Sequence, residues 1–263
     1  MKTLHVRDLE MAVVEEGDGL PLLLVHGFPL DHTMWKYQID HFSQHCRVIA
    51  PDLRGFGRTG VTPGVTTMEQ MADDLNALLD ALGVQEKILF CGLSMGGYVG
   101  WQFARKYEDR LKALVACDTR VIADSAEQAA SRRELAERVL REGPSPVAES
   151  MLPKLFGSDT QGRRPDLVQA TREVIMRTNP EGIAAALRGL AERPDMSDFV
   201  TKLEVSTLVI VGEHDAISSP AEMEGIAESM PNAAWVVVPH AGHLSPLENP
   251  DVFNESLAQY ITL

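Results

Sequence analysis

A serine stands at the centre of the pattern Gly-x-Ser-x-Gly in residues Gly92–Gly96. An apolar run, Lys87–Cys91, precedes the pattern and a helical pattern follows it, so Ser94 lies where a strand turns sharply into a helix. Such a turn projects the serine hydroxyl above the edge of a sheet, and the glycines leave room where a Cβ would collide with the turn. The pattern indicates a nucleophilic serine. Alternatively, the small residues of this pattern only allow a tight turn between a strand and a helix, without a catalytic role.

A serine hydroxyl is a poor nucleophile unless a base removes its proton, and that base must be held by a carboxylate. Asp215 follows the apolar run Thr207–Val211, and His243 follows the run Trp235–Val238. Because the carboxyl ends of parallel strands gather at one edge of a sheet, we expect both side chains near Ser94.

The elements that must position these residues are short apolar runs without alternation, which are typical of parallel strands buried on both faces. The runs are Pro21–Val25, Arg47–Ala50, Lys87–Cys91, Ala113–Cys117, Thr207–Val211 and Trp235–Val238. The alternating stretch Thr3–Glu16, which ends in the turn Gly17–Gly19, indicates a further strand pair. Together the runs predict an α/β fold with a mostly parallel, doubly wound, eight-stranded sheet.

Helical periodicity is clearest in Met68–Leu82, where Thr67 can cap the first turn and Gly83 stops the run. Further helices are predicted from about Gly96 to Lys106 and from Pro250 to the C-terminus.

The interval between Cys117 and Thr207 is far longer than the roughly 2 to 6 residues of an ordinary connection in such a sheet. Four helix-rich segments fill it, separated by Gly and Pro breaks. They are Glu127–Arg141, Pro146–Phe156, Pro165–Arg177 and Pro180–Glu192. We therefore expect a helical cap of residues 121–200, inserted after the sixth strand into a core of residues 1–120 and 201–263.

The composition is that of a globular chain of 263 residues, 44% hydrophobic and 24% charged. With 24 Lys and Arg against 38 Asp and Glu, the net charge is −14, which argues against nucleic acid or a membrane surface as partner. Cys46, Cys91 and Cys117 are expected to be free core thiols. The N-terminus has no signal-type apolar stretch, so we expect a cytoplasmic protein. The sequence does not distinguish a monomer from a homodimer.

The order of these motifs resembles that of the α/β-hydrolase fold family, in which serine, acid and histidine follow one another along the chain. The resemblance covers essentially the whole chain and implies Ser94 as nucleophile, Asp215 as acid and His243 as base. It implies further that the backbone N–H groups of Phe28 and Met95 form an oxyanion hole. The other segments that carry the resemblance are His26–Pro29, Asp52–Thr59, Gly242-His243 and Leu247–Pro250.

Three neighbouring residues compete for the same roles. The family pattern puts the histidine after a glycine, which favours His243 over His240. Asp118 lies directly after the sixth strand, where some family members have the acid, and Glu213 is a third carboxylate. Asp215 is preferred because it follows its strand as the common pattern demands.

No cofactor and no metal are expected. Residues Gly55–Gly60 formally match the dinucleotide pattern G-x-G-x-x-G, but they are separated from their strand and no helix opens after them. His240, His243 and Asp215 fit the neighbourhood of a triad better than a metal site. An oxidoreductase with a nicotinamide cofactor is therefore a weaker alternative.

The resemblance implies hydrolysis of small carboxylic esters or lactones through an acyl-enzyme on Ser94. Arg120 could supply a cation for an anionic lactone, although a surface arginine paired with Asp124 is the plainer interpretation. The expected apolar lining of the pocket is Trp35, Met151, Leu155, Ile217 and Leu244.

Met34-Trp35 and the serine motif look like the 3-oxoadipate enol-lactonase branch of the family. Similar serine motifs occur in small carboxylesterases and in cofactor-free perhydrolases. A C–C hydrolase and a non-catalytic ligand receptor of the same fold are less favoured. Serine rather than aspartate at position 94 argues against dehalogenase and epoxide hydrolase chemistry.

Overall fold

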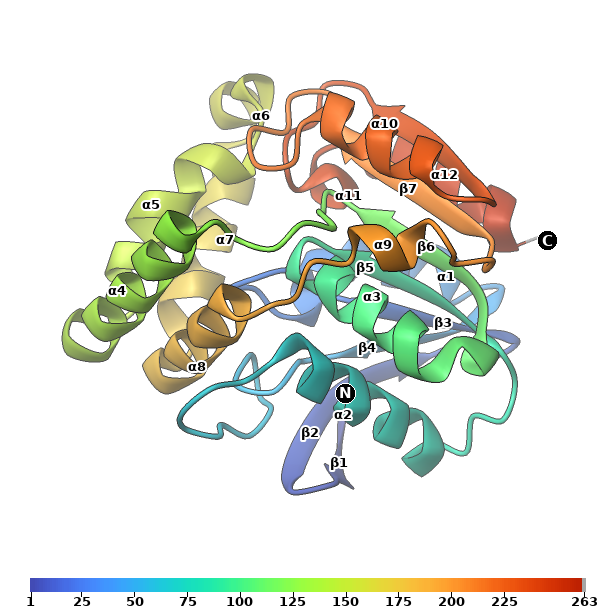
Figure 1. Cartoon of the computed structure of the whole chain (residues 1–263), viewed down its shortest axis with the longest axis horizontal. Coiled ribbons are helices and arrows are strands. Elements are labelled where there is room, and N and C mark those ends of the chain that lie inside the picture. The colour runs from blue at the N-terminus through green and yellow to red at the C-terminus, as the bar shows by residue number, and fades with distance from the viewer. Residues whose placement is uncertain (262–263) are drawn as a thin grey trace.

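One eight-stranded sheet, in the order β1-β2-β4-β3-β5-β6-β7-β8, is the frame of the molecule (Figure 1). The computed structural model describes residues 1–261. β1 is antiparallel to β2 and β2 to β4, whereas all the other neighbouring strands in this sheet are parallel. The predicted mostly parallel sheet is confirmed. The strands are β1 Lys2–Val6, β2 Leu9–Glu16, β3 Leu20–Val25, β4 Cys46–Pro51, β5 Ile88–Leu93, β6 Leu111–Cys117, β7 Thr207–Gly212 and β8 Ala233–Val238.

Helices pack on the sheet and bury the central strands, which explains why the sequence of those strands does not alternate. β5 and β7 are buried at every position. α2 packs against α3, and α1 packs against α12. The helices outside the cap are α1 Lys36–Phe42, α2 Met68–Ala81, α3 Met95–Tyr107, α10 Pro220–Ser229, α11 Ser245–Glu248 and α12 Pro250–Ile261, with 3-10 turns η1 His32–Trp35 and η2 Glu108–Arg110.

The predicted helix boundaries agree closely with the structure where capping signals are strong. The Thr67 side chain accepts a hydrogen bond from the N–H of Gln70 at the start of α2, and Gly83 follows its end with a φ of +67°. α12 begins at Pro250 as predicted, but the last two residues of that predicted helix, 262 and 263, lie outside the described residues.

Five helices fill the long interval between β6 and β7, and a short sixth, α9, leads back to β7. Figure 1 shows α4 to α8 as a group beside the carboxyl ends of the strands. α4 packs along α8, and α5 packs against both α4 and α7. This insertion after the sixth strand is as predicted, whereas the cap boundaries at 121 and 200 stay a prediction. The helices are α4 Ala126–Glu142, α5 Ser145–Leu155, α6 Ser158–Arg163, α7 Pro165–Arg177, α8 Pro180–Ala191 and α9 Ser197–Val200.

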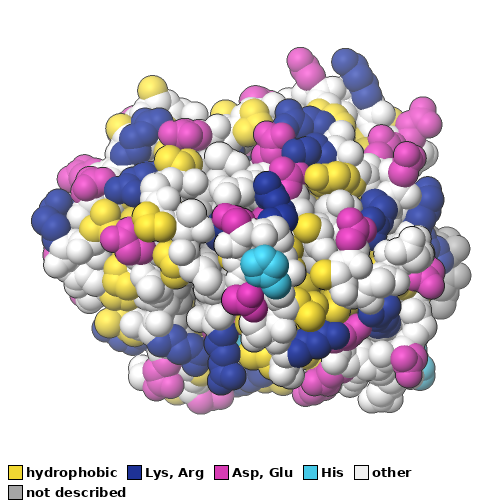
Figure 2. Space-filling view, turned by 90° about the horizontal axis from the view of Figure 1, so that it is seen from below, with side chains coloured by type: hydrophobic (Ala, Val, Ile, Leu, Met, Phe, Trp, Pro, Cys, Tyr) yellow, Lys and Arg dark blue, Asp and Glu magenta, His cyan; other side chains and the backbone are white. Residues whose placement is uncertain are grey.

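The three thiols lie in the core as expected, and the surface mixes charges of both signs. On the face shown in Figure 2, acidic and basic side chains are interspersed rather than gathered by sign. Cys46, Cys91 and Cys117 are free and buried, and the last two place their sulfur atoms 3.7 Å apart. Within residues 1–261, no helix combines the length and the apolar character needed to cross a membrane.

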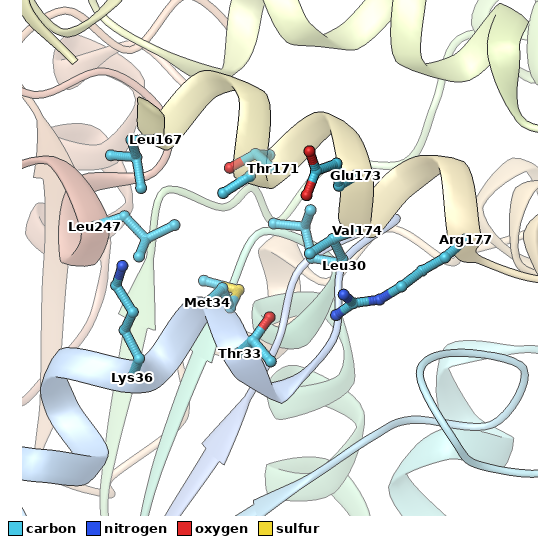
Figure 3. Close-up of a pocket in the computed structure, with 11 residues that line it drawn as sticks. Leu30, Thr33, Met34, Lys36, Leu167, Thr171, Glu173, Val174, Arg177 and Leu247 are labelled. Atoms are coloured by element: carbon cyan, nitrogen blue, oxygen red, sulfur yellow. The ribbon is translucent and has the colours of Figure 1, made fainter. Parts of the chain in front are cut away.

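A cavity of about 220 Å³ lies at the seam between the cap helix α7 and the loop after β3 (Figure 3). Arg177, at the end of α7, reaches across this seam and donates a hydrogen bond of 2.7 Å to the carboxylate of Asp31. The Asp31 side chain is only 4% exposed, whereas that of Arg177 is 56% exposed. Burial raises the pKa of Asp31, but the hydrogen bonds from Arg177 and Thr33 outweigh it and hold that pKa below its usual range.

Arg177→Ala is expected to lower the free energy of unfolding at pH 7 by about 1–2 kcal/mol, because it leaves a buried carboxylate without its charged partner. Urea unfolding measures the effect. Since the pKa of Asp31 is lower in the folded chain, the stabilisation is present above the ordinary value of 3.8 and is lost as the pH falls through the folded-state pKa.

Arg138→Ala is the matched control, because Arg138 pairs with Glu142 while both side chains are exposed. We expect that variant to stay within about 0.5 kcal/mol of the wild type. Equal effects of the two substitutions would contradict a stabilising role for the Arg177–Asp31 pair.

Candidate active site

The turn between β5 and α3 holds Ser94 in a strained conformation with a φ of +52°. A Cβ on Gly92 would lie 2.3 Å from the carbonyl oxygen of Gly96, and one on Gly96 would lie 2.2 Å from that of Val25. Only glycine fits at both positions. The local geometry therefore has the sharp strand-to-helix turn that the sequence pattern predicts.

Asp215 and His243 form a buried hydrogen-bonded pair at the ends of β7 and β8. Nδ1 of His243 lies 2.8 Å from Oδ2 of Asp215, and the two side chains are 2% and 0% exposed. The other carboxylate oxygen accepts hydrogen bonds from the N–H groups of Ile217 (2.7 Å) and Ser218 (3.0 Å). The carboxylate is thus fixed in place and can orient the imidazole, leaving Nε2 for proton transfer.

Ser94 and His243 line the same cavity, which has a volume of about 470 Å³ and lies between the core and the cap helices. Phe28 and Met95, the expected oxyanion-hole residues, line it as well. Of the expected pocket residues, Arg120, Met151 and Ile217 belong to its wall. The other lining residues are Tyr98, Asp124, Glu127, Gln128, Ser131, Arg132, Leu135, Ser150, Lys154, Leu187, Leu190 and Ala216.

Three residues expected in the pocket belong to the core instead. Trp35, Leu155 and Leu244 are at most 1% exposed and do not line the cavity. The indole of Trp35 packs against Phe253, with ring centroids 6.0 Å apart, and the N–H of Leu244 donates to the carbonyl of Leu155. An apolar side chain near a site can line a cavity or pack in the core, and these three side chains pack in the core.

The charges around the cavity also differ from expectation. Arg120 lines the cavity, but its guanidinium donates two hydrogen bonds, of 2.6 and 2.8 Å, to Glu222 and none to Asp124. Asp124 pairs with Arg132 and Arg193. Lys154 on α5 also lines the cavity, and no carboxylate of the described residues pairs with it.

The comparisons with known proteins agree with this geometry. A family model described as alpha/beta hydrolase fold matches residues 21–250. The chain belongs to the α/β-hydrolase family. A curated relative of this hydrolase, 3-oxoadipate enol-lactonase 2 of Acinetobacter baylyi, is 27% identical over 257 residues, which cover 97% of this chain and 94% of that protein.

Two solved structures are close to the hydrolase over its whole length. A thermophilic esterase from Thermogutta terrifontis, described as malate bound, is 48% identical with a TM-score of 0.98, covering 100% of this chain and 98% of that one. The enol-lactonase from Burkholderia xenovorans LB400 is 29% identical with a TM-score of 0.92, covering 100% of both chains. The hydrolase is an enzyme of the carboxylic ester hydrolase class, and the predicted fold is confirmed.

The competing residues of the hydrolase occupy different places. His240 is 74% exposed and does not line the cavity; its backbone N–H donates to the exposed Glu213. Asp118 is buried next to Asp215 and accepts hydrogen bonds from Gly212 and Ser245. The structure therefore brings Asp215 and His243 together at the cavity of Ser94 and leaves His240 outside it.

His26 stabilises the loop that contains Phe28. Its Nε2 accepts the N–H of Leu53 at 2.9 Å, which leaves Nδ1–H to donate to the carbonyl of Gly27 at 3.0 Å. Complete burial lowers the pKa of His26, so the ring is neutral near pH 7. This histidine joins the loops after β3 and β4 and so supports the expected oxyanion hole.

Three groups of His and acidic side chains in the described chain bring possible metal-ligand atoms within 4.8 Å of one another. In one, Asp31 accepts from Arg177 and Asp52 accepts from His32, so these carboxylates already have donors. The second contains the buried Asp215–His243 pair, and the third is exposed. The groups are Asp31, His32 and Asp52; Asp118, Asp215 and His243; and Glu213, His214 and His240.

Proposed function

We propose that this α/β-hydrolase cleaves small carboxylic esters or lactones through an acyl-enzyme on Ser94. The observation that supports it most directly is the buried Asp215–His243 pair at the cavity that Ser94 lines. Oγ of Ser94 attacks the carbonyl carbon while Nε2 of His243 accepts the serine proton, and the Asp215 carboxylate stabilises the imidazolium that forms.

The second half of the cycle reverses the proton transfers. His243 gives its proton to the leaving alkoxide, and a water molecule then loses a proton to the same nitrogen and attacks the acyl carbon. The bond from that carbon to Oγ of Ser94 breaks, Oγ takes the proton back from His243, and the carboxylic acid is released. The proposed oxyanion hole consists of the N–H groups of Phe28 and Met95. Because Met95 opens α3, its N–H has no acceptor within the helix and lies at the positive end of the helix dipole.

Hydrolysis of p-nitrophenyl esters of increasing acyl length tests the proposal, with 3-oxoadipate enol-lactone in the same panel. A cavity of about 470 Å³ favours short acyl groups over long ones. Turnover by the wild type that disappears in Ser94→Ala would support a serine hydrolase. No turnover of any member would contradict the proposal and favour a C–C hydrolase or a ligand receptor. Peroxide in place of water as the second nucleophile would make the enzyme a perhydrolase, which stays an alternative.

An unpaired lysine in the wall of the cavity supports an anionic substrate, as the enol-lactonase branch would require. Arg120 is paired with Glu222 and Arg132 with Asp124. Among the charged lining residues that the structure describes, Lys154 and Glu127 have no ion-pair partner, so Lys154 is the cation available to a substrate carboxylate. The names of the relatives agree with this choice, because 3-oxoadipate enol-lactone and malate both carry carboxylates.

Lys154→Met is expected to reduce the preference for a carboxylate-bearing ester over a neutral ester of equal size by about three- to tenfold. The ratio of the two kcat/KM values measures this preference, and added salt should reduce it in the wild type. Lys36→Met, at the separate cavity of Figure 3, is the matched control and should leave the ratio unchanged. An unchanged ratio in Lys154→Met would contradict the assignment.

A further inference from the structure

Asp118 is a buried carboxyl group beside the triad that the proposed mechanism does not use. It follows β6 directly, with a φ of +46°, and its side chain joins three elements. Oδ1 accepts the N–H of Gly212, the last residue of β7, at 2.8 Å. Oδ2 lies 2.5 Å from the hydroxyl of Ser245, the first residue of α11. The ends of β6 and β7 and the segment directly after His243 are therefore connected through this one carboxyl group.

Two carboxyl groups and one imidazole share this buried space. An oxygen of Asp118, an oxygen of Asp215 and a ring nitrogen of His243 lie within 4.8 Å of one another. Both acids are buried, and two carboxylates this close in a dry site are not ionised together, because their charges repel without solvent to screen them. One of the two acids must therefore keep its proton at neutral pH.

The hydrogen-bond donors decide which acid keeps the proton. Asp215 accepts from two backbone N–H groups and from the imidazole of His243, and all three stabilise a negative charge. Asp118 accepts from a single N–H, that of Gly212, while its second neighbour is the hydroxyl of Ser245, which can accept as well as donate. The negative charge therefore belongs on Asp215.

We propose that Asp118 is a positioning residue that works as a neutral carboxylic acid, tying the ends of β6 and β7 to α11 while Asp215 carries the charge that His243 needs. The inference rests on the proposed function, because it takes Asp215 as the acid of the triad. A neutral tie holds the loops of the acid and the base together without placing a second anion beside the imidazole.

The electrostatic surroundings of Asp118 agree with this assignment. Burial raises the pKa of Asp118 well above its usual range, and the charge of Asp215 raises it further, while the hydrogen bonds from Ser245 and Gly212 act in the opposite direction. The neighbouring thiol of Cys117 also has a raised pKa, caused first by its burial and then by Cys91, so it adds no charge.

The test compares thermal unfolding of the wild type and Asp118→Asn over a series of pH values. The pKa of Asp118 is higher in the folded chain than its ordinary 3.8, so its stabilisation is complete below 3.8 and is lost as the pH rises toward the folded-state pKa. Asparagine does not ionise. The Tm of Asp118→Asn minus that of the wild type is therefore expected to increase as the pH rises above about 4.

Asp31→Asn is the matched control for this pH series. Asp31 is also buried, but its pKa is lowered, so its stabilisation is present above 3.8 and is lost as the pH falls. The wild type should therefore gain stability relative to Asp31→Asn as the pH rises, which is the opposite trend. Opposite trends for two buried aspartates would assign the effect to the protonation state and not to burial.

Ester hydrolysis at neutral pH gives the second readout, which a merely structural role would not move. Asp118→Ala leaves Gly212 and Ser245 without their hydrogen-bond partner and is expected to lower kcat by about tenfold to a hundredfold with KM little changed. Asp118→Asn keeps the shape and the neutral charge and should restore most of the wild-type kcat. If Asp118→Ala does not fold, Asp118→Asn alone still decides, through its kcat and its pH series.

A Tm difference that is independent of pH, or that moves in favour of the wild type as the pH rises, would overturn the proposal. So would loss of most of the activity in Asp118→Asn, because Asp118 would then act as an anion. The proposed function fails by a different result, namely turnover that survives Ser94→Ala.

Discussion

Ser94→Ala is expected to reduce kcat for a short p-nitrophenyl ester by on the order of 10⁴- to 10⁶-fold. The substitution removes the one atom that forms the acyl-enzyme, while Asp215 and His243 keep their hydrogen bond. The residual rate would come from the oxyanion hole and from substrate binding alone. Alanine fits in the space of serine and adopts the strained backbone conformation at position 94 at a similar cost, so the Tm should change little.

The matched control is Ser131→Ala, since Ser131 is an exposed serine that lines the same cavity. We expect its kcat to stay within about twofold of the wild type. A serine-reactive phosphonate, followed by mass spectrometry of the peptides, should label position 94 in both the wild type and the control. Labelling at position 131, or turnover that survives in Ser94→Ala, would rule out the proposed acyl-enzyme.

Asp215→Asn is expected to lower kcat by about 10³- to 10⁴-fold. The amide can still accept the N–H groups of Ile217 and Ser218, so the loop should keep its conformation. The amide nitrogen, however, would then face Nδ1 of His243, which reverses the tautomer of the imidazole and removes the charge that stabilises the imidazolium. Steady-state kinetics with circular dichroism would separate this loss from unfolding.

Glu213→Gln is the control for this second prediction. Glu213 is exposed and lies two residues before Asp215 on the same loop. Its carboxylate accepts a hydrogen bond from the backbone N–H of His240 and lies 3.8 Å from Nε2 of His214. We expect near wild-type kcat, since its carboxylate does not touch His243. The reverse pattern, with Glu213→Gln inactive and Asp215→Asn active, would transfer the role of the acid.

The positions of Ser94, Asp215 and His243 in the fold could be predicted because each stands at a recognisable junction. Ser94 lies between an apolar run and a helix, and Asp215 and His243 follow the last two apolar runs, so the topology of a parallel sheet alone brings them to one edge. The apolar patterns indicate which segments are strands and helices, and the path of the backbone through those elements then places the three side chains.

The pocket wall could not be predicted in the same way. Apolar periodicity reports burial, but it does not say whether a side chain meets the core, as Trp35 does, or a cavity, as Met151 does. Tyr98 could have been predicted to line the cavity, because it lies one helical turn after Ser94 and so on the same face of the helix. The partner of Arg120 is far away in sequence, and Lys154 had no local signal at all.

The missed helices divide into two kinds. α1, α6, α9 and α11 have seven residues or fewer, which is too short for a periodic pattern, and tertiary packing stabilises them. α10 could have been predicted, because Ser219 caps its first turn and Pro220 occupies its first position.

The insertion of the cap between β6 and β7 has a consequence for biosynthesis. The turn that holds Ser94 is translated before the cap, whereas Asp215 and His243 are translated after it. β7 can join β6 only after the whole cap has been made, and such distant pairing is slow because a long loop must close. A nascent chain therefore holds Ser94 without Asp215 and His243 until the cap, β7 and β8 have been made.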